Sequence, residues 1–135
     1  MIRVFAILGI LIGASVMVSL AFLPAFGPPR MGHKVRCASQ LHQIGLAISL
    51  YADEHSGKIP QTFDDLHPYA SDLDKLLICP SAKDTSTPNY QILAGGQKWS
   101  SLETTNVIVV TEPISNHGDG RNALYGDGHM MWLPN

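Results

Sequence analysis

Residues 37–51 read CASQLHQIGLAISLY, and this stretch decides the fold. Its apolar members recur at spacings of three and four, which places them on one side of an α-helix: Cys37, Leu41, Ile44, Ile48 and Tyr51. Polar residues lie on the opposite side: Ser39, Gln40, Gln43 and Ser49. The pattern predicts an amphipathic helix of about five turns with one buried face. Gly57, a short distance beyond, is a typical helix stop signal.

The chain before this helix has two parts. Gly27-Pro28-Pro29 interrupts helical structure, because proline lacks an amide donor and clashes with the preceding turn, so residues 27–36 are predicted to form a basic neck. Residues 4–26 carry no charge, and a helix over them would be about 34 Å long, enough to cross a bilayer core of about 30 Å. We therefore expect a transmembrane anchor over residues 1–26. A cleaved signal peptide, with a cleavage site at Ser19-Leu20-Ala21 or at Leu23-Pro24-Ala25, is the alternative.

Charge is distributed unevenly along the chain. Residues 1–36 hold four Lys/Arg and no acid, whereas residues 37–135 hold five Lys/Arg and eleven Asp/Glu, for a net charge of −6. An acidic domain excludes a strongly basic nucleic-acid binder, which needs a cationic face to neutralise phosphates. The basic residues after the apolar run favour a cytoplasmic domain by the positive-inside rule.

The two cysteines indicate the opposite topology. Cys37 lies on the buried helical stripe, and Cys79 ends an apolar run just before Pro80. Two cysteines in an exported domain of this size predict a disulfide. A bond between residues 42 positions apart would stabilise the fold by about 4 kcal/mol. Two separately buried thiols are the alternative. The sequence has no C-x-x-C motif, so it suggests neither a zinc site nor a redox site at these cysteines.

The remainder of the chain predicts short elements around a small sheet. Residues 62–66 read as a short helix with Thr62 as its N-cap and Asp65 three residues on. One short strand is expected near residues 90–93, and the β-branched run at 107–110 predicts a buried strand.

The last strands form a predicted hairpin around Asp127-Gly128, a dipeptide typical of two-residue turns. In that register Tyr125 lies opposite Met130, Leu124 opposite Met131 and Ala123 opposite Trp132. The expected fold of residues 37–135 is therefore α+β, with the amphipathic helix packed on a small antiparallel β-sheet.

The segment around the hairpin also carries a resemblance. His117 is followed after nine residues by Asp127-Gly128, which resembles the prepilin-type H-x9-D-G family of pseudopilin-like, membrane-anchored bacterial proteins, similar to type II secretion protein G. Further segments match the family in order over about residues 20–135: Leu23-Pro24-Ala25, Arg36-Cys37-Ala38-Ser39-Gln40-Leu41, Gln43-Ile44-Gly45-Leu46-Ala47, Tyr51-Ala52-Asp53, Gly57-Lys58-Ile59-Pro60 and Cys79-Pro80-Ser81.

The resemblance implies a pilin-like protein with a membrane helix, a helical spine and a C-terminal sheet. It places the domain in the periplasm or outside the cell, anchored by a single pass through the cytoplasmic membrane. The implied role is structural, linked to type II secretion or type IV pilus-like assemblies, with self-association or secretion and pilus components as partners. It implies no catalysis, cofactor or small-molecule substrate. Pilins carry a Gly-Phe processing site and an early glutamate, and residues 1–26 contain neither, which favours a stand-alone anchored relative.

Three hypotheses describe the C-terminal cluster of histidines and acids. In the favoured structural one, Asp127-Gly128 makes the turn and His117 hydrogen-bonds the neighbouring loop. In the second, four side chains bind zinc or calcium: His117, Asp119, Asp127 and His129. The third is a metal-dependent hydrolase with Glu112 as its base.

Overall fold

The computed structural model describes residues 29–86, 88–102 and 106–135. The predicted anchor over residues 1–26 and the first part of the predicted break, Gly27-Pro28, lie outside the described residues. Within the described part of the chain, no helix is both long enough and apolar enough to cross a membrane.

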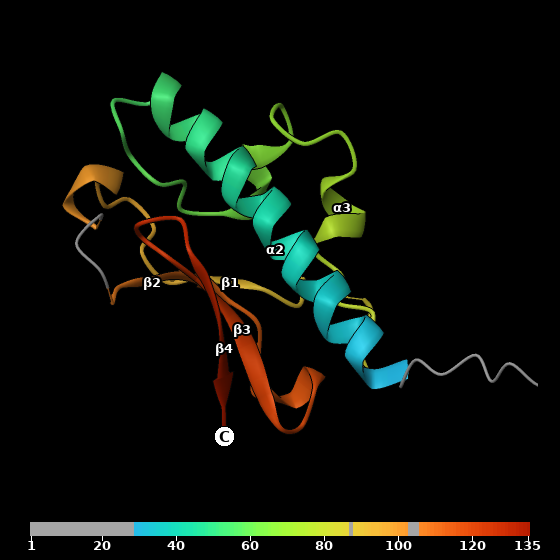
Figure 1. The fold of residues 1–135 in the computed structure, drawn as a ribbon. Coiled ribbons are helices and arrows are strands. Elements are labelled where there is room, and N and C mark those ends of the chain that lie inside the picture. The colour runs from blue at the N-terminus through green and yellow to red at the C-terminus, as the bar shows by residue number, and fades with distance from the viewer. Residues whose placement is uncertain (1–28, 87, 103–105) are drawn as a thin grey trace, which may run out of the picture.

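The long helix α2 spans Pro29–Glu54 (Figure 1). It begins eight residues before the apolar stripe, so residues 29–36 of the predicted neck are its first two turns. Proline suits the first helical position, where its missing amide would have no partner and its φ is already helical. The helix ends at a turn in which Ser56 and Gly57 have φ of 57° and 77°. The Gly57 amide donates to the Ala52 carbonyl at 2.7 Å, which closes the last turn as the predicted stop signal requires.

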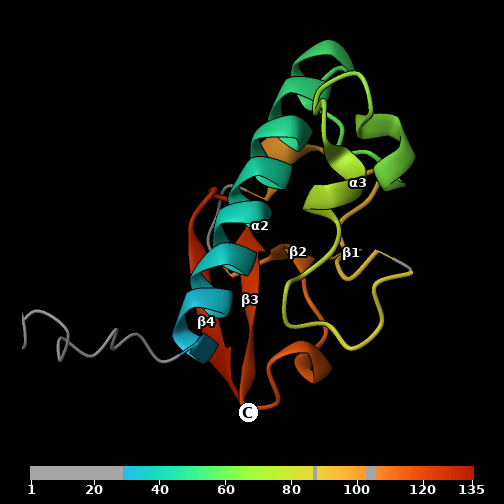
Figure 2. The same ribbon diagram turned by 90° about the vertical axis from the view of Figure 1, so that its right-hand side faces the viewer.

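A four-stranded antiparallel sheet forms the second layer of the molecule. Its strands are β1 (Gln91–Ile92), β2 (Ile108–Thr111), β3 (Gly120–Tyr125) and β4 (Met130–Pro134), in the spatial order β1-β2-β3-β4. Helix α2 crosses one face of this sheet, as the two views in Figures 1 and 2 show. The expected α+β architecture, one long helix on an antiparallel sheet, is confirmed.

The hydrophobic core lies between the two layers. The predicted stripe of α2 is buried at Cys37, Leu41, Ile44 and Ile48, and Tyr51 is half-buried at its edge. The strands contribute Val109, Val110 and Leu124. Gly45 lets α2 approach β3 closely, because a Cβ there would lie only 2.9 Å from the Leu124 side chain.

The predicted disulfide is confirmed. Cys37 in α2 is bonded to Cys79, with their Cα atoms 5.4 Å apart, and the described residues contain no free cysteine. The bond ties the N-terminal half of α2 to the segment that follows the short helix α3 (Leu73–Leu76). Both cysteines are fully buried, so the bridge is part of the core.

The C-terminal hairpin forms, but the predicted register is wrong by one residue. Leu124 pairs with Met130, Ala123 with Met131 and Asn122 with Trp132. The Tyr125 amide donates to the His129 carbonyl, so three residues, Gly126-Asp127-Gly128, form the loop. Only Gly128 has positive φ, 86°, whereas a two-residue type I′ turn would need positive φ at Asp127 as well. In the three-residue loop, Asp127 therefore does not adopt the unfavourable positive φ.

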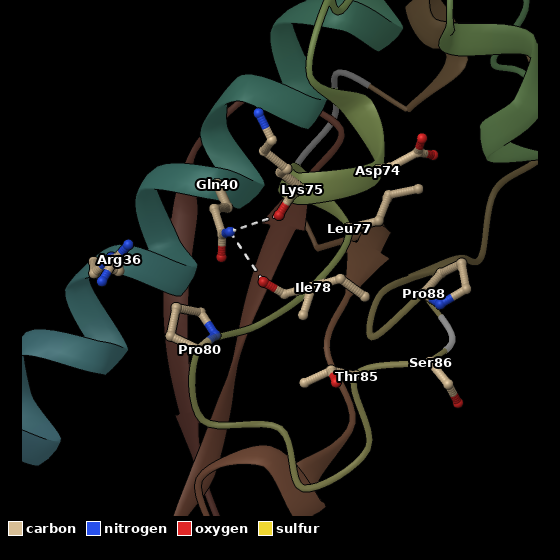
Figure 3. Close-up of a pocket in the computed structure, with 10 residues that line it drawn as sticks. All are labelled: Arg36, Gln40, Asp74, Lys75, Leu77, Ile78, Pro80, Thr85, Ser86 and Pro88. Carbon is tan, nitrogen blue, oxygen red and sulfur yellow. Dashed lines mark hydrogen bonds between the residues drawn. The ribbon is translucent and has the colours of Figure 1, made fainter.

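Short helical turns connect the layers. The turn η1 (Phe63–Leu66) is capped as predicted: Asp65 Oδ2 accepts from the Thr62 amide at 3.4 Å and from its hydroxyl at 3.2 Å. The turns η2 (Trp99–Ser101) and η3 (Ile114–Asn116) flank β2. Gln40, expected on the solvent face, instead donates to the carbonyls of Lys75 and Ile78 at 3.1 and 3.0 Å, which fastens α3 to α2 (Figure 3).

Candidate functional site

The described chain contains a fully buried carboxylate at the end of strand β2. Glu112 is 0% exposed, and its Oε1 accepts two hydrogen bonds from Asn122, from the backbone amide at 2.7 Å and from the side-chain amide at 2.6 Å. Burial of a carboxylate without hydrogen-bond donors costs free energy, and the two donors of Asn122 offset that cost. They occupy one carboxylate oxygen and leave Oε2 directed away from Asn122.

His117 faces that second oxygen. The chain leaves β2 through Pro113 and the turn η3, and His117 follows as the C-terminal cap of that turn. Its Nε2 lies 3.2 Å from Glu112 Oε2, with the two side chains only 2% and 0% exposed. The imidazole also meets the Trp132 ring edge-to-face, with centroids 5.4 Å apart. The His117 ring is therefore held by its contact with Trp132 and by its hydrogen bond with Glu112.

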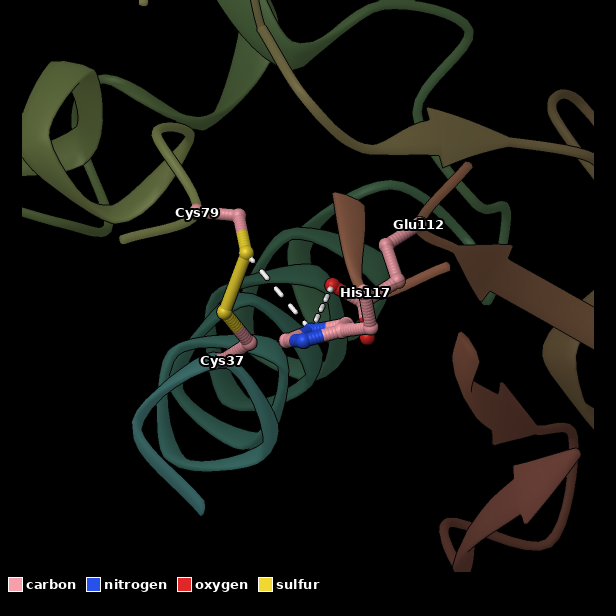
Figure 4. Close-up of side chains that lie close together, drawn as sticks. All are labelled: Cys37, Cys79, Glu112 and His117. Carbon is pink, nitrogen blue, oxygen red and sulfur yellow. Dashed lines mark hydrogen bonds and ion pairs between the residues drawn. A yellow bond between two sulfur atoms is a disulfide. The ribbon is translucent and has the colours of Figure 1, made fainter. Parts of the chain in front are cut away.

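The disulfide also contacts His117. Cys79 Sγ lies 3.7 Å from the same Nε2 of His117 (Figure 4). Four residues thus converge at one point between the start of α2 and the sheet: Cys37, Cys79, Glu112 and His117. We call this group the cysteine–histidine–glutamate cluster.

Buried polar side chains support the cluster from its surroundings. Asn89 Oδ1 accepts from the Cys79 amide at 3.1 Å, and the Tyr90 hydroxyl donates to the Cys37 carbonyl at 3.2 Å. Burial, reinforced by the nearby Glu112 carboxylate, raises the pKa of Tyr90 above its ordinary value of 10.0. The phenol therefore stays protonated and remains a donor.

A surface pocket of about 610 Å³ opens beside His117. It lies between the first turns of α2 and the loop after η3, with His33, Lys34, Ser81 and Asn116 among its lining residues. Lys34 covers its rim by pairing with Asp119 and by lying over the Trp132 ring, 4.2 Å from its centroid. His117 is the one member of the cluster that lines this pocket, although its side chain is almost fully buried.

The four residues that sequence reasoning grouped as metal ligands occupy three separate places. His117 lies in the buried cluster, whereas Asp119 is exposed and receives a hydrogen bond from Lys34, which lowers the pKa of Asp119. Asp127 and His129 pair with each other at the hairpin loop, beyond the far end of β3. Among the described residues, the cysteine–histidine–glutamate cluster is the group whose ligand atoms converge.

Asp127 and Gly128 lie in the hairpin loop, where Asp127 makes a local contact. Asp127 Oδ1 accepts from the His129 amide at 3.1 Å, and this hydrogen bond is the main cause of the lowered pKa of Asp127. Gly128 supplies the left-handed position of the loop. His117 braces the loop after β2 rather than the hairpin tip, through Glu112.

The cluster does not have the arrangement of a nucleophilic triad. In such a triad the histidine contacts the nucleophile through one ring nitrogen and its orienting acid through the other. Here Glu112 and Cys79 both face Nε2 of His117. Sequence reasoning considered Glu112 only as a hydrolytic base and missed its pairing with Asn122 and His117. The one local signal was an acid two residues after the apolar run at 107–110, with Thr111 between them.

A second pocket, of about 800 Å³, is lined by Gln40 together with the segments around α3 and before β1 (Figure 3). Apolar side chains such as Leu77 and Pro88 line it, and Arg36, Asp74 and Lys75 lie at its edges. Its charged groups are of both signs, so they favour neither an anion nor a cation.

Comparison of the chain with family models, with curated proteins and with solved structures finds no match.

Proposed function

We propose that this chain is a membrane-anchored, pilin-like structural or interaction protein whose domain lies outside the cytoplasmic membrane. One observation carries the proposal: α2 follows the uncharged run at residues 4–26 closely, packs one side against an antiparallel sheet and is tied by the disulfide to the segment after α3. This is the arrangement expected of a helical spine that holds a small domain at a membrane surface. The resemblance to the H-x9-D-G family points the same way.

The outer side of α2 supports a role in contacts rather than in chemistry. Three large apolar residues lie on that exposed side, Val35, Leu46 and Leu50, with exposed fractions of 67%, 54% and 52%. Their spacings of eleven and four residues place them on one stripe along the helix. These exposed apolar side chains are available for contact with another protein or a membrane.

The disulfide supports the location. Structural disulfides form and persist in oxidising compartments and are rare in the cytosol. Both sulfurs are buried in the core, so the bond is a structural one. This chemistry supports the proposal of an extracytoplasmic domain, whereas the basic residues near the start of α2 favour the opposite topology.

Fractionation with a protease-protection assay tests the proposal. We expect the full chain in the membrane fraction, resistant to alkaline extraction, with its domain degraded by protease added from outside the cytoplasmic membrane. A matched variant that begins at residue 29 should lose membrane association while keeping the disulfide under oxidising conditions. A full chain in the soluble fraction, or a domain protected in the cytoplasm, would overturn the proposal.

A further inference from the structure

The cysteine–histidine–glutamate cluster brings together four atoms of the kinds that bind zinc. They are the Sγ atoms of Cys37 and Cys79, a carboxylate oxygen of Glu112 and a ring nitrogen of His117, all within 4.8 Å of one another. The four residues come from different parts of the chain: α2, the segment after α3, the end of β2 and the residue after η3. The fold itself therefore brings this donor set together.

Two of the distances between these atoms are close to those of a tetrahedral zinc site. Zinc binds sulfur at about 2.3 Å and nitrogen or oxygen at about 2.0–2.1 Å, so its ligand atoms lie roughly 3.3–3.8 Å apart. The distance from His117 Nε2 to Cys79 Sγ is 3.7 Å, and that from Nε2 to Glu112 Oε2 is 3.2 Å. The principal change needed to admit an ion is the separation of the two bonded sulfurs.

The donors are also held in the manner of metal ligands. Both hydrogen bonds from Asn122 go to Oε1 of Glu112, which directs Oε2 toward the cluster. Outer hydrogen bonds of this type orient ligating carboxylates in metal sites. Two thiolates and one carboxylate around Zn²⁺ carry a formal charge of −1, between that of the Cys₂His₂ and Cys₄ sites that proteins use.

We propose that the reduced form of this chain binds one zinc ion through Cys37, Cys79, Glu112 and His117, in place of the disulfide. A dithiol reductant supplies two electrons to the Cys37–Cys79 bond and becomes a disulfide itself, and each cysteine sulfur receives a proton. Zinc binding then releases both thiol protons to solvent, because thiolates are the ligands. The disulfide and the zinc ion are thus alternative cross-links between α2 and the segment after α3.

This assignment revises the inference from cysteine spacing. A C-x-x-C pair supplies two zinc ligands from one turn, whereas here the two sulfurs lie 42 residues apart and meet only in the folded chain. Of the four proposed ligands, His117 is the one that lines the pocket described above. The zinc form belongs to reducing conditions, whereas the proposed extracytoplasmic domain holds the disulfide, so the two proposals describe different redox states of the chain and are tested by different experiments.

Metal binding to the purified full chain in detergent tests the proposal. The chain is reduced with a dithiol, desalted without oxygen and titrated with Zn²⁺ or with Co²⁺ as its spectroscopic substitute. We expect one ion per chain, with the intense visible bands of tetrahedral Co²⁺ and thiolate-to-cobalt charge transfer. The oxidised chain should show neither signal. A reduced chain that gives only the weak bands of octahedral cobalt would overturn the proposal.

Two ligand variants and one control locate the site. Glu112→Gln and His117→Gln each remove a ligand and should weaken zinc binding by at least about 100-fold, since even outer-shell partners contribute 10–100-fold. His129→Gln, which changes an exposed histidine at the hairpin loop, should bind zinc as the unaltered chain does. Unchanged affinity in both ligand variants would refute the four-ligand site.

Alkylation of the unaltered chain tests the same site without requiring any variant to fold. In the reduced chain, one equivalent of zinc should protect both Cys37 and Cys79 from a thiol reagent, and a chelator should restore their reactivity. Equal alkylation with and without zinc would also overturn the proposal.

Discussion

At the residue scale, the cluster depends on one buried carboxylate and its donors. Glu112 has no exposed surface, so its free energy in the folded state depends on Asn122 and His117. Removal of one partner of a buried charged group costs more than the loss of an exposed ion pair, because the remaining charge is left without solvent. Asn122 also reaches the Lys34 carbonyl at 3.4 Å, which joins the sheet to the start of α2.

Asn122→Ala should therefore destabilise the chain. It removes the 2.6 Å hydrogen bond from the side-chain amide to Glu112 and leaves the backbone bond in place. We expect a loss of about 1.5–3 kcal/mol in the free energy of unfolding, measured by urea denaturation. Asn135→Ala, at an exposed position, is the control and should change stability by about 0.5 kcal/mol or less. Equal effects of the two substitutions would contradict the role given to Asn122.

Gly126 is required by a close backbone approach. A Cβ at this position would overlap the carbonyl oxygen of Leu102, and the Gly126 amide is held by the Val107 carbonyl at 2.9 Å. Gly126→Ala should cost several kcal/mol, on the order of 3, because backbone must move to admit the methyl group. Gly128→Ala meets open space but has φ of 86°, and it should cost about 1–2 kcal/mol. Thermal unfolding compares the two, and a smaller loss for Gly126→Ala would be the contrary result.

Tyr69 offers a pH-dependent signal. Its hydroxyl donates to Glu54 Oε2 at 2.6 Å, and this hydrogen bond raises the pKa of Tyr69 from 10.0 to about 12. The protonated phenol is favoured in the folded state, so its contribution to stability is complete below pH 10 and is lost as the pH rises through 12. Tyrosinate absorbance should show this late titration, and Glu54→Gln should move it toward the ordinary value. Titration of Tyr69 unaltered by that substitution would contradict the assignment.

At the element scale, periodicity predicted α2 well because burial follows it directly. The apolar stripe from Cys37 to Ile48 is buried, and the turn at Ser56 and Gly57 ends the helix as expected. The helix begins earlier than the apolar stripe, at Pro29, because a proline at the first helical position is compatible with the helix that follows. The hairpin register was misjudged because Asp127-Gly128 fits both a two-residue and a three-residue loop.

The disulfide should be the strongest single constraint between these elements. It closes a separation of 42 residues, for which the chain-entropy relation gives about 4 kcal/mol. Reduction in the presence of a chelator should lower the free energy of unfolding, measured by urea denaturation, by about 2–5 kcal/mol. The chelator alone should leave the urea midpoint of the oxidised chain unchanged. Cys37→Ser with Cys79→Ser should reproduce the loss and make stability independent of reductant. A reduced chain as stable as the oxidised one would contradict this prediction.

At the scale of the whole molecule, sequence reasoning predicted the layers but not the cluster between them. An apolar period of three to four residues and a β-branched run are local signals, so the helix and strands could be located. The cluster joins residues 37, 79, 112 and 117. Their proximity depends on how the layers pack, so their spacing in the sequence does not predict it. The metal hypothesis named His117, but it grouped that residue with neighbours in sequence that the fold sends to other places.

The packing of the layers predicts that residues 29–135 fold without the segment before them. Every member of the main hydrophobic core lies between Cys37 and Leu124, so no described core contact requires residues 1–28. We expect this fragment to unfold cooperatively in urea, with a free energy of unfolding of about 5–15 kcal/mol, and to form the disulfide on oxidation. Eight Lys/Arg and eleven Asp/Glu give it a net charge of −3, which favours solubility. Helical circular dichroism without a cooperative transition would show that the core is incomplete, and α2 would then need the preceding segment to hold its position on the sheet.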